Sequence, residues 1–122
     1  MATKLSIYPF MKEIKEVIFK SVTRQDSKEK ITIFSGHDTV IAPVLAALGV
    51  YRQKDLCVWP PYASRIVFEI YIPAKQEPKE FTIEEARKIV HLRVLYNGFI
   101  IHYNNCRENY YNIFTFLYTC FV

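Results

Sequence analysis

The spacing of apolar residues predicts two helices in the first fifty positions. Across residues 7–21 apolar side chains recur every three or four positions and charged side chains fill the other side, which is typical of an amphipathic helix. Pro9 is expected in its first turn, where a missing N–H costs little. A second run, apolar on nearly every side and closed by Gly49 as a C′ residue, predicts a buried helix. Pro43 is expected in the first turn of this helix, which places its start near residues 38–40.

Three runs of β-branched and aromatic residues predict strands. They span residues 30–35, 65–72 and 91–96, and each is followed at once by Gly, Pro or Asn-Gly. The first run is continuous rather than alternating, which favours a strand covered on both faces, as in a parallel sheet between helices. With the helix after it, this run forms a strand, tight turn and helix, which is half of a βαβ unit. The predicted fold class is therefore α/β with a mixed sheet.

The remaining segments predict loops, one short helix and a tail of different amino-acid composition. Residues 56–62 form a loop, since their consecutive prolines continue neither a helix nor a central strand. Residues 82–89 begin with a capping-box pattern and predict a short helix. The last part of the chain is rich in asparagine and aromatic residues, and no fold is predicted for it. We therefore expect one domain over residues 1–98 and a separate tail over residues 99–122.

Length and composition narrow the class of protein. The 122 residues form one domain at most, and 51% hydrophobic residues supply a core and argue against disorder. The net charge of +4 does not predict a nucleic-acid partner, because basic residues near the start alternate with acidic ones, as on a solvated face. The longest apolar run, residues 113–122, has about half the roughly 20 residues of a membrane span. Because residues 1–19 also lack the uninterrupted apolar stretch of a secretory signal, we expect no targeting or anchoring segment in the sequence as written.

The three cysteines, Cys57, Cys106 and Cys120, do not predict a metal site. Their odd number leaves at least one thiol unpaired within the chain, and no C-x-x-C spacing is present. Neither their disulfide state nor the redox compartment follows from the sequence. We expect no metal and no cofactor.

The candidate site is His37-Asp38, between the strand predicted at residues 30–35 and the buried helix. Ligands of open α/β sheets bind at the carboxyl ends of strands, and the amino end of a helix attracts phosphate. A His placed there donates hydrogen bonds to a phosphoryl oxygen, and an Asp delivers a proton if burial raises its pKa. The structural alternative is that Asp38 is a helix N-cap and His37 a packing residue. A His-Asp metal site is disfavoured, because His91 and His102 lie in strand-like surroundings.

Several other residues have both a structural and a functional interpretation. Arg65 is a substrate contact or, more simply, a surface or ion-pair residue at the start of a strand. Trp59 and Tyr62 line a sugar-binding wall or, more simply, pack the proline loop. Glu84 and Glu85 are explained by helix initiation.

Three landmarks give the chain a resemblance to a known family. They are residues 33–51, which contain the His-Asp pair, residues 60–71, which begin Pro-Pro-Tyr-Ala-Ser-Arg, and residues 94–98, Val-Leu-Tyr-Asn-Gly. In this order and at these separations they resemble the histidine acid phosphatases over roughly residues 3–98. The resemblance implies part of the histidine-phosphatase fold and a phosphomonoester substrate. The amino-acid sequences of the three landmarks are most similar to those of family members that act on a sugar phosphate of a glycan.

The resemblance also implies residue roles. In this family a nucleophilic His in an Arg-His-Gly motif takes the phosphoryl group, flanking Arg side chains bind it, and a second His donates to it. By motif match, His37 is the second His, and Asp38 is the acid that protonates the leaving alcohol. The secretory pathway, Golgi or lysosome, is implied in the same way, whereas no compartment follows from the chain itself.

The chain departs from the family pattern at the nucleophile. Its three histidines follow Gly36, Val90 and Ile101, so no Arg-His-Gly motif is present, and the tail resembles no part of the family. We therefore expect a fragment from the C-terminal half of the domain, either a truncated isoform or a partial gene model, with negligible turnover alone. The alternative from another class is a non-catalytic α/β module that binds a phosphorylated ligand or a protein partner. Exact substrate and oligomeric state do not follow from the sequence.

Overall fold

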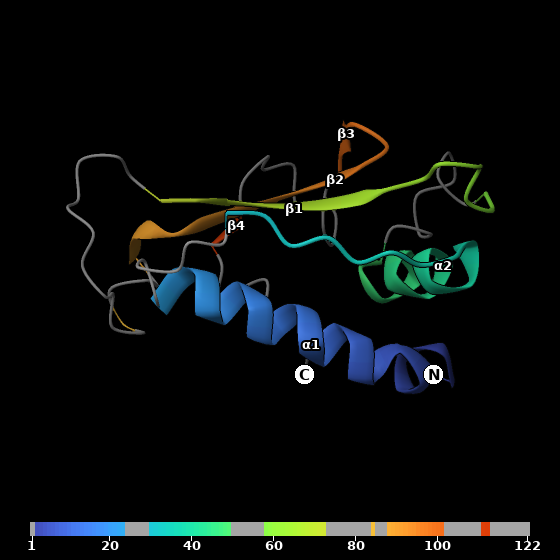
Figure 1. Ribbon diagram of the computed structural model, residues 1–122, viewed down its shortest axis with the longest axis horizontal. Coiled ribbons are helices and arrows are strands. Elements are labelled where there is room, and N and C mark those ends of the chain that lie inside the picture. The colour runs from blue at the N-terminus through green and yellow to red at the C-terminus, as the bar shows by residue number, and fades with distance from the viewer. Residues whose placement is uncertain are drawn as a thin grey trace.

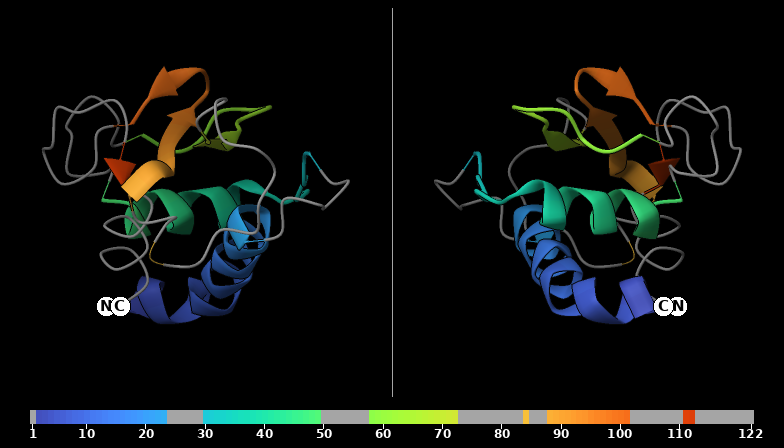
Figure 2. Two further views of the ribbon diagram at one scale, coloured as in Figure 1. Left: turned by 90° about the vertical axis from the view of Figure 1, so that its left-hand side faces the viewer. Right: turned by 90° about the vertical axis from the view of Figure 1, so that its right-hand side faces the viewer.

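Two helices and a small antiparallel sheet make up the described part of the chain (Figure 1). The computed structural model describes residues 2–23, 30–49, 58–72, 84, 88–101 and 111–112. The helices are α1 (Ala2–Thr23) and α2 (Asp38–Ala47), and the strands are β1 (Ile66–Tyr71), β2 (His91–Tyr96), β3 (Phe99–Ile100) and β4 (Tyr111–Asn112). Both helices lie on the same side of the sheet (Figure 2).

The first predicted helix is confirmed as α1, which is 22 residues long. Its buried side chains recur at helical spacing and join the core: Ile7, Met11, Ile14, Ile18 and Val22. The helix begins earlier than expected, so Pro9 lies inside it rather than in its first turn. Pro9 is exposed, and its missing N–H removes one hydrogen bond of the helix.

The second predicted helix is confirmed as α2, which begins at Asp38 as expected. It packs against α1, and Leu45 and Leu48 are 0% and 2% exposed. Gly49 has a φ of 75° and takes the left-handed conformation that commonly ends a helix. Pro43 lies in the second turn rather than the first.

Residues 30–37 are extended but form no strand, so the strand predicted in this segment is wrong. Ile31 and Ile33 are 77% and 80% exposed, whereas a strand of a parallel sheet between helices is covered. Phe34 fixes the segment to α1, where its ring meets that of Phe10 edge-on with centroids 5.4 Å apart. The β-rich composition favours extended backbone, but a strand also needs a hydrogen-bonded neighbour, and none of the described strands pairs with this segment.

The other two predicted strands are confirmed as β1 and β2, which form an antiparallel pair. The face toward the helices pairs apolar residues: Ile66 with Tyr96, Phe68 with Val94 and Ile70 with Leu92. The outer face pairs Val67 with Leu95, Glu69 with Arg93, and Tyr71 with His91. Successive side chains of a strand point to opposite faces, so one face completes the core and the other carries polar groups.

The predicted turn at Asn97-Gly98 joins β2 to β3. These residues have φ values of 49° and 87°, as in the two-residue turns that favour Asn-Gly in hairpins. The short strands β3 and β4 both pair with β2, antiparallel like β1. Every strand pairing in the described residues is therefore antiparallel, and the parallel component expected of a mixed sheet is not found there.

The α/β class is confirmed, because the helices and the sheet share one hydrophobic core. Most of the helix predicted at residues 82–89 lies outside the described residues, although residues 84, 88 and 89 are helical. All three cysteines and most of residues 99–122 also lie outside the described residues. The expected boundary between domain and tail therefore stays a prediction.

Candidate active site

The predicted pair His37-Asp38 lies at the start of α2, and both residues are exposed. His37 is the N-cap residue: its backbone is extended, and its carbonyl accepts the amides of Val40 and Ile41 at 2.9 and 3.1 Å. Its imidazole makes no capping hydrogen bond. His37 therefore lies at the positive end of the helix dipole, and its ring does not cap the helix. The structural alternative for Asp38 is wrong in this respect, since Asp38 is the first helical residue and not the N-cap.

The carboxylate of Asp38 accepts one hydrogen bond on each oxygen. The amide of Thr39 donates to Oδ1 at 2.8 Å, and the indole Nε1 of Trp59 donates to Oδ2 at 2.7 Å. Both distances lie in the range of well-formed hydrogen bonds. Asp38 is not buried as a proton donor was expected to be. Its orientation is set instead by one donor from its own helix and one from a loop 21 residues away.

The loop that carries Trp59 does not pack in the way expected of its aromatic residues. Trp59 is 59% exposed, and Tyr62 is fully exposed, whereas Pro60 between them is buried. The contact between Trp59 and Asp38 was not predicted. The sequence contains one indication of this contact, a tryptophan in a proline-rich loop, because the indole N–H of a tryptophan usually finds a hydrogen-bond partner. The sequence does not indicate which residue accepts that hydrogen bond.

A chain of hydrogen bonds ties this loop to the end of β2. Ser64 Oγ donates to the Pro61 carbonyl at 2.6 Å, and the Asn97 side-chain amide donates to Ser64 Oγ at 3.2 Å. The Asn97 side-chain oxygen accepts a hydrogen bond from the backbone amide of Arg65 at 2.8 Å, and the backbone amide of Asn97 donates to the Arg65 carbonyl at 3.0 Å. We call these bonds among Pro61, Ser64, Arg65 and Asn97 the Asn97 clasp.

The three landmarks read in the sequence meet at one end of the molecule. The start of α2, the loop over residues 58–65 and the turn after β2 lie together at the end where the loop reaches the helix (Figure 1). The Asn97 clasp joins the second landmark to the third, and the Trp59 indole joins that loop to the first. The side chain of Arg65 is exposed and forms no ion pair with a described residue. Arg65 therefore contributes to the Asn97 clasp through its backbone and not through its charge.

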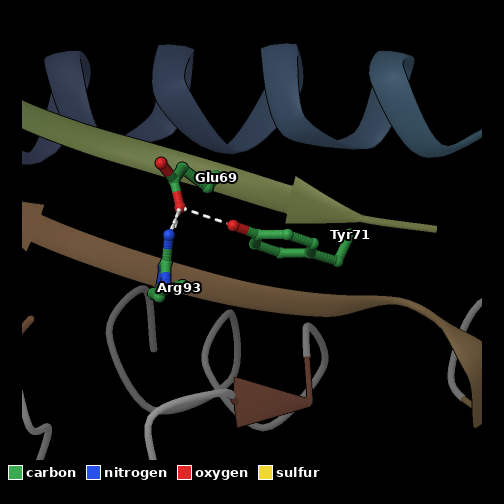
Figure 3. A network of polar contacts seen from close by, with 3 residues as sticks. All are labelled: Glu69, Tyr71 and Arg93. Carbon is green, nitrogen blue, oxygen red and sulfur yellow. Dashed lines mark hydrogen bonds and ion pairs between the residues drawn. The ribbon is translucent and has the colours of Figure 1, made fainter.

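A second polar cluster lies on the outer face of the sheet and was not predicted (Figure 3). Arg93 Nε donates to Glu69 Oε2 at 2.7 Å and forms an ion pair with it, and the Tyr71 hydroxyl donates to the same oxygen at 2.8 Å. The Tyr71 hydroxyl first, and then Arg93, hold the pKa of Glu69 below its ordinary value, while partial burial opposes them. Because α2 lies on the other face, this cluster is separate from His37 and Asp38.

The described residues include a surface hollow, but neither a cluster of metal-ligating side chains nor a helix that could cross a membrane. Among them no group of three metal-ligating side chains comes together, and no described helix is long and apolar enough to cross a membrane. A shallow hollow of about 360 Å³ lies on the outside of α1, lined by Tyr8, Lys12, Lys15, Glu16, Phe19 and Lys20. Its side chains all come from one helix, and it does not include the His-Asp pair.

Comparison with protein families gives the site its context. The family model of the histidine phosphatase superfamily, branch 2, matches residues 7–97. The chain belongs to this superfamily. The matched range contains α2, both long strands and the His-Asp pair, so the family predicted from the three landmarks is confirmed. The roles of His37 and Asp38 are not tested by this match.

The curated relatives are phosphatases, and the chain covers a small part of each. It is 30% identical over 84 residues to mouse lysophosphatidic acid phosphatase type 6, covering 66% of the chain and 19% of the relative. It is 34% identical over 70 residues to rat 2-phosphoxylose phosphatase 1, covering 57% of the chain and 12% of the relative. The zebrafish 2-phosphoxylose phosphatase 1 is 33% identical over 98 residues, covering 77% of the chain and 18% of the relative. No solved structure matches the chain significantly.

Proposed function

We propose that this chain forms part of a phosphomonoester hydrolase in which His37 binds the phosphoryl group and Asp38 protonates the leaving alcohol. The observation that carries the proposal is the His-Asp pair at the start of α2, inside the family match, with its carboxylate held by two donors. Helix N-termini attract phosphate through their amides and dipole. The unused imidazole of His37 adds a further donor beside that site.

The reaction needs a nucleophile that the chain does not contain. An imidazole attacks phosphorus, the P–O bond to the alcohol breaks, and the alkoxide takes the proton of Asp38. Water then attacks the phosphohistidine, giving inorganic phosphate and the free imidazole, while Asp38 regains a proton. None of the three histidines in the chain follows an arginine. We therefore place the attacking imidazole outside this sequence and expect no measurable turnover of an aryl phosphate by the chain alone at mildly acidic pH.

The proton-donor role is tested in a chimera that supplies the missing nucleophile. Residues 7–97 replace the matching segment of mouse lysophosphatidic acid phosphatase type 6, and circular dichroism checks that the chimera folds. Asp38→Asn is expected to lower kcat about 10²- to 10⁴-fold for an alkyl phosphate. The loss should be much smaller for an aryl phosphate, because a phenolate leaves without a proton.

The control for this experiment is Glu13→Gln, which removes an exposed carboxylate of α1 and should leave kcat unchanged for both substrates. An equal loss for both leaving groups in Asp38→Asn, or no loss, contradicts the proton-donor role. Turnover by the unmodified chain that Asp38→Ala abolishes contradicts the placement of the nucleophile.

For the substrate class we propose a sugar phosphate of a glycan, such as 2-phosphoxylose. The support is the resemblance of the landmarks to the 2-phosphoxylose phosphatases and the exposed ring of Trp59 beside Asp38, since aromatic side chains commonly line ligand pockets.

Because the chain has a single tryptophan, its fluorescence reports binding at this place. We expect tighter binding of 2-phosphoxylose than of inorganic phosphate; equal affinities, or tighter binding of lysophosphatidic acid, contradict the sugar phosphate.

A non-catalytic module is the second candidate, and the lack of an Arg-His-Gly motif in the 122 residues favours it. Such a module would bind a phosphorylated ligand through the same helix terminus without hydrolysing it. The reading frame upstream of residue 1 decides between the two. An Arg-His-Gly motif joined to this sequence supports the enzyme, and transcripts that begin and end as this sequence does support the binding module.

A further inference from the structure

We infer that Trp59 is a positioning residue, whose indole N–H fixes the orientation of the Asp38 carboxyl group from outside α2. Its catalytic meaning rests on the proposed function, but the contact itself does not. The observation is the 2.7 Å hydrogen bond from Trp59 Nε1 to Asp38 Oδ2. Nothing in the family match or in the names of the relatives assigns this residue a role.

Two donors in different elements determine how the carboxyl group is turned. The Thr39 amide holds Oδ1 from within the helix, and the Trp59 indole holds Oδ2 from the loop. With one donor the group rotates about its bond to Cβ, whereas two donors fix its plane. Each carboxylate oxygen has two lone pairs, so Oδ2 keeps one lone pair for the proton that Asp38 transfers.

The exposure of Trp59 supports a positioning role rather than a packing role. More than half of its surface is exposed (59%), although burying a tryptophan is one of the larger hydrophobic gains available to a chain. A solvent-exposed hydrogen bond is worth little unless its partners are already ordered. The bond therefore depends on a loop that is itself ordered.

The Asn97 clasp and Pro60 supply that order. Pro60 is buried next to Trp59, and its ring fixes the local φ. The next residue is Pro61, and its carbonyl accepts a hydrogen bond from the Ser64 hydroxyl, which accepts one from the side-chain amide of Asn97 at the end of β2. The orientation of Asp38 is thus coupled to the sheet through the loop and not only to its own helix.

The experiment uses the full chain labelled with ¹⁵N, in which the single tryptophan gives one indole N–H signal. We expect this signal downfield in the unmodified chain, and an upfield shift in Asp38→Ala with about tenfold faster exchange with solvent. The isosteric Asp38→Asn, which keeps the shape and loses the charge, should give a smaller shift in the same direction. The matched control Tyr62→Phe alters a fully exposed ring of the same loop and should leave the signal in place.

A second readout reports coupling across the carboxyl group. Trp59→Phe keeps an aromatic ring and removes the N–H, and we expect it to speed the exchange of the Thr39 amide with solvent, although the two residues touch different oxygens. A change of ring current alone would shift the amide signal without changing its exchange rate. An indole signal identical in Asp38→Ala and the unmodified chain overturns the inference, and so does an unchanged exchange rate of the Thr39 amide in Trp59→Phe.

Addition of inorganic phosphate separates this inference from the proposed function. Shifts of the His37 ring and the indole signal on adding phosphate support both. If phosphate moves neither signal while Asp38→Ala moves the indole, the phosphate site fails and the positioning of Asp38 by Trp59 stands. If phosphate moves His37 while Asp38→Ala leaves the indole unmoved, the positioning role is overturned and the phosphate site stands.

Discussion

Asn97 meets two requirements at once, one of its backbone conformation and one of its side-chain hydrogen bonds. Its backbone has a φ of 49°, which asparagine tolerates better than most residues with a Cβ. Its amide oxygen accepts the amide of Arg65, and its NH₂ group donates to Ser64. Glycine would satisfy the backbone but not the clasp, and aspartate would accept the first bond but not donate the second.

We expect Asn97→Gly to lower the free energy of unfolding by about 1–2 kcal/mol, because two side-chain hydrogen bonds of about 0.5–1 kcal/mol each are lost. Asn97→Ala should lower it by about 1–2 kcal/mol more than Asn97→Gly does, because the same bonds are lost and strain at a positive φ is added. Urea unfolding followed by circular dichroism measures both. If alanine costs no more than glycine, backbone conformation is not what selects asparagine here.

At the scale of elements, the outer faces of β1 and β2 carry a charged pair next to the apolar pair of Val67 and Leu95. Glu69 and Arg93 are direct cross-strand partners, and Tyr71 donates to the same carboxylate oxygen. Their side chains are partly exposed, 34% for Glu69 and 23% for Arg93, so solvent weakens the pair. The alternating pattern of the strands predicts which residues share this face, but the register that brings Glu69 opposite Arg93 follows from the pairing.

The stabilisation from Glu69 should depend on pH with a definite sign. Its pKa is lower in the folded chain than its ordinary value of 4.5, so it stabilises the fold at pH above that value, and the effect is lost as pH falls through the lowered value. At pH 7 we expect Glu69→Gln to cost about 0.5–1 kcal/mol.

The measurement is urea unfolding of Glu69→Gln and of the unmodified chain over a series of pH values. The difference between them should shrink at pH well below 4.5, where Glu69 itself becomes neutral. Glu16→Gln, an exposed carboxylate of α1, serves as the control. A difference that stays constant down to low pH would show that the pair is held by geometry and not by charge.

The whole molecule is organised by a single core between the helices and the inner face of the sheet. Buried side chains of α1, α2 and β2 form one cluster, with Ile66, Phe68 and Ile70 of β1 packed against it. The apolar residues of the segment over residues 30–35, Ile31, Ile33 and Phe34, are exposed and do not belong to this core. Yet the residues of β1 that pack against it are of the same two kinds, isoleucine and phenylalanine. Hydrophobicity alone therefore does not decide which segments are buried here.

Two alanine substitutions test this division. Leu45→Ala should lower the free energy of unfolding by about 2–5 kcal/mol, because Leu45 is fully buried and its removal leaves a cavity. Ile33→Ala should change it by less than about 0.5 kcal/mol, because Ile33 is 80% exposed. Thermal or urea unfolding measures both, and a loss for Ile33→Ala comparable to that for Leu45→Ala would place residues 30–35 inside the core.

The sequence by itself determined the features that depend on neighbouring residues. Apolar spacing predicted α1, and a run apolar on nearly every side predicted α2 as a buried helix. The β-rich runs predicted β1 and β2, and Asn97-Gly98 predicted the hairpin turn, because helical period, strand period and positive φ are local properties. The order of the three landmarks was sufficient to predict the family.

Only the tertiary structure decided the contacts between distant segments. Whether residues 30–35 become a strand depends on a hydrogen-bonded neighbour, which no local preference supplies. The hydrogen bond from Trp59 to Asp38 spans 21 residues and that from Arg93 to Glu69 spans 24. Contacts of this kind form because packing brings the segments together, and so the orientation of the carboxyl group at the candidate site could be seen only in the folded chain.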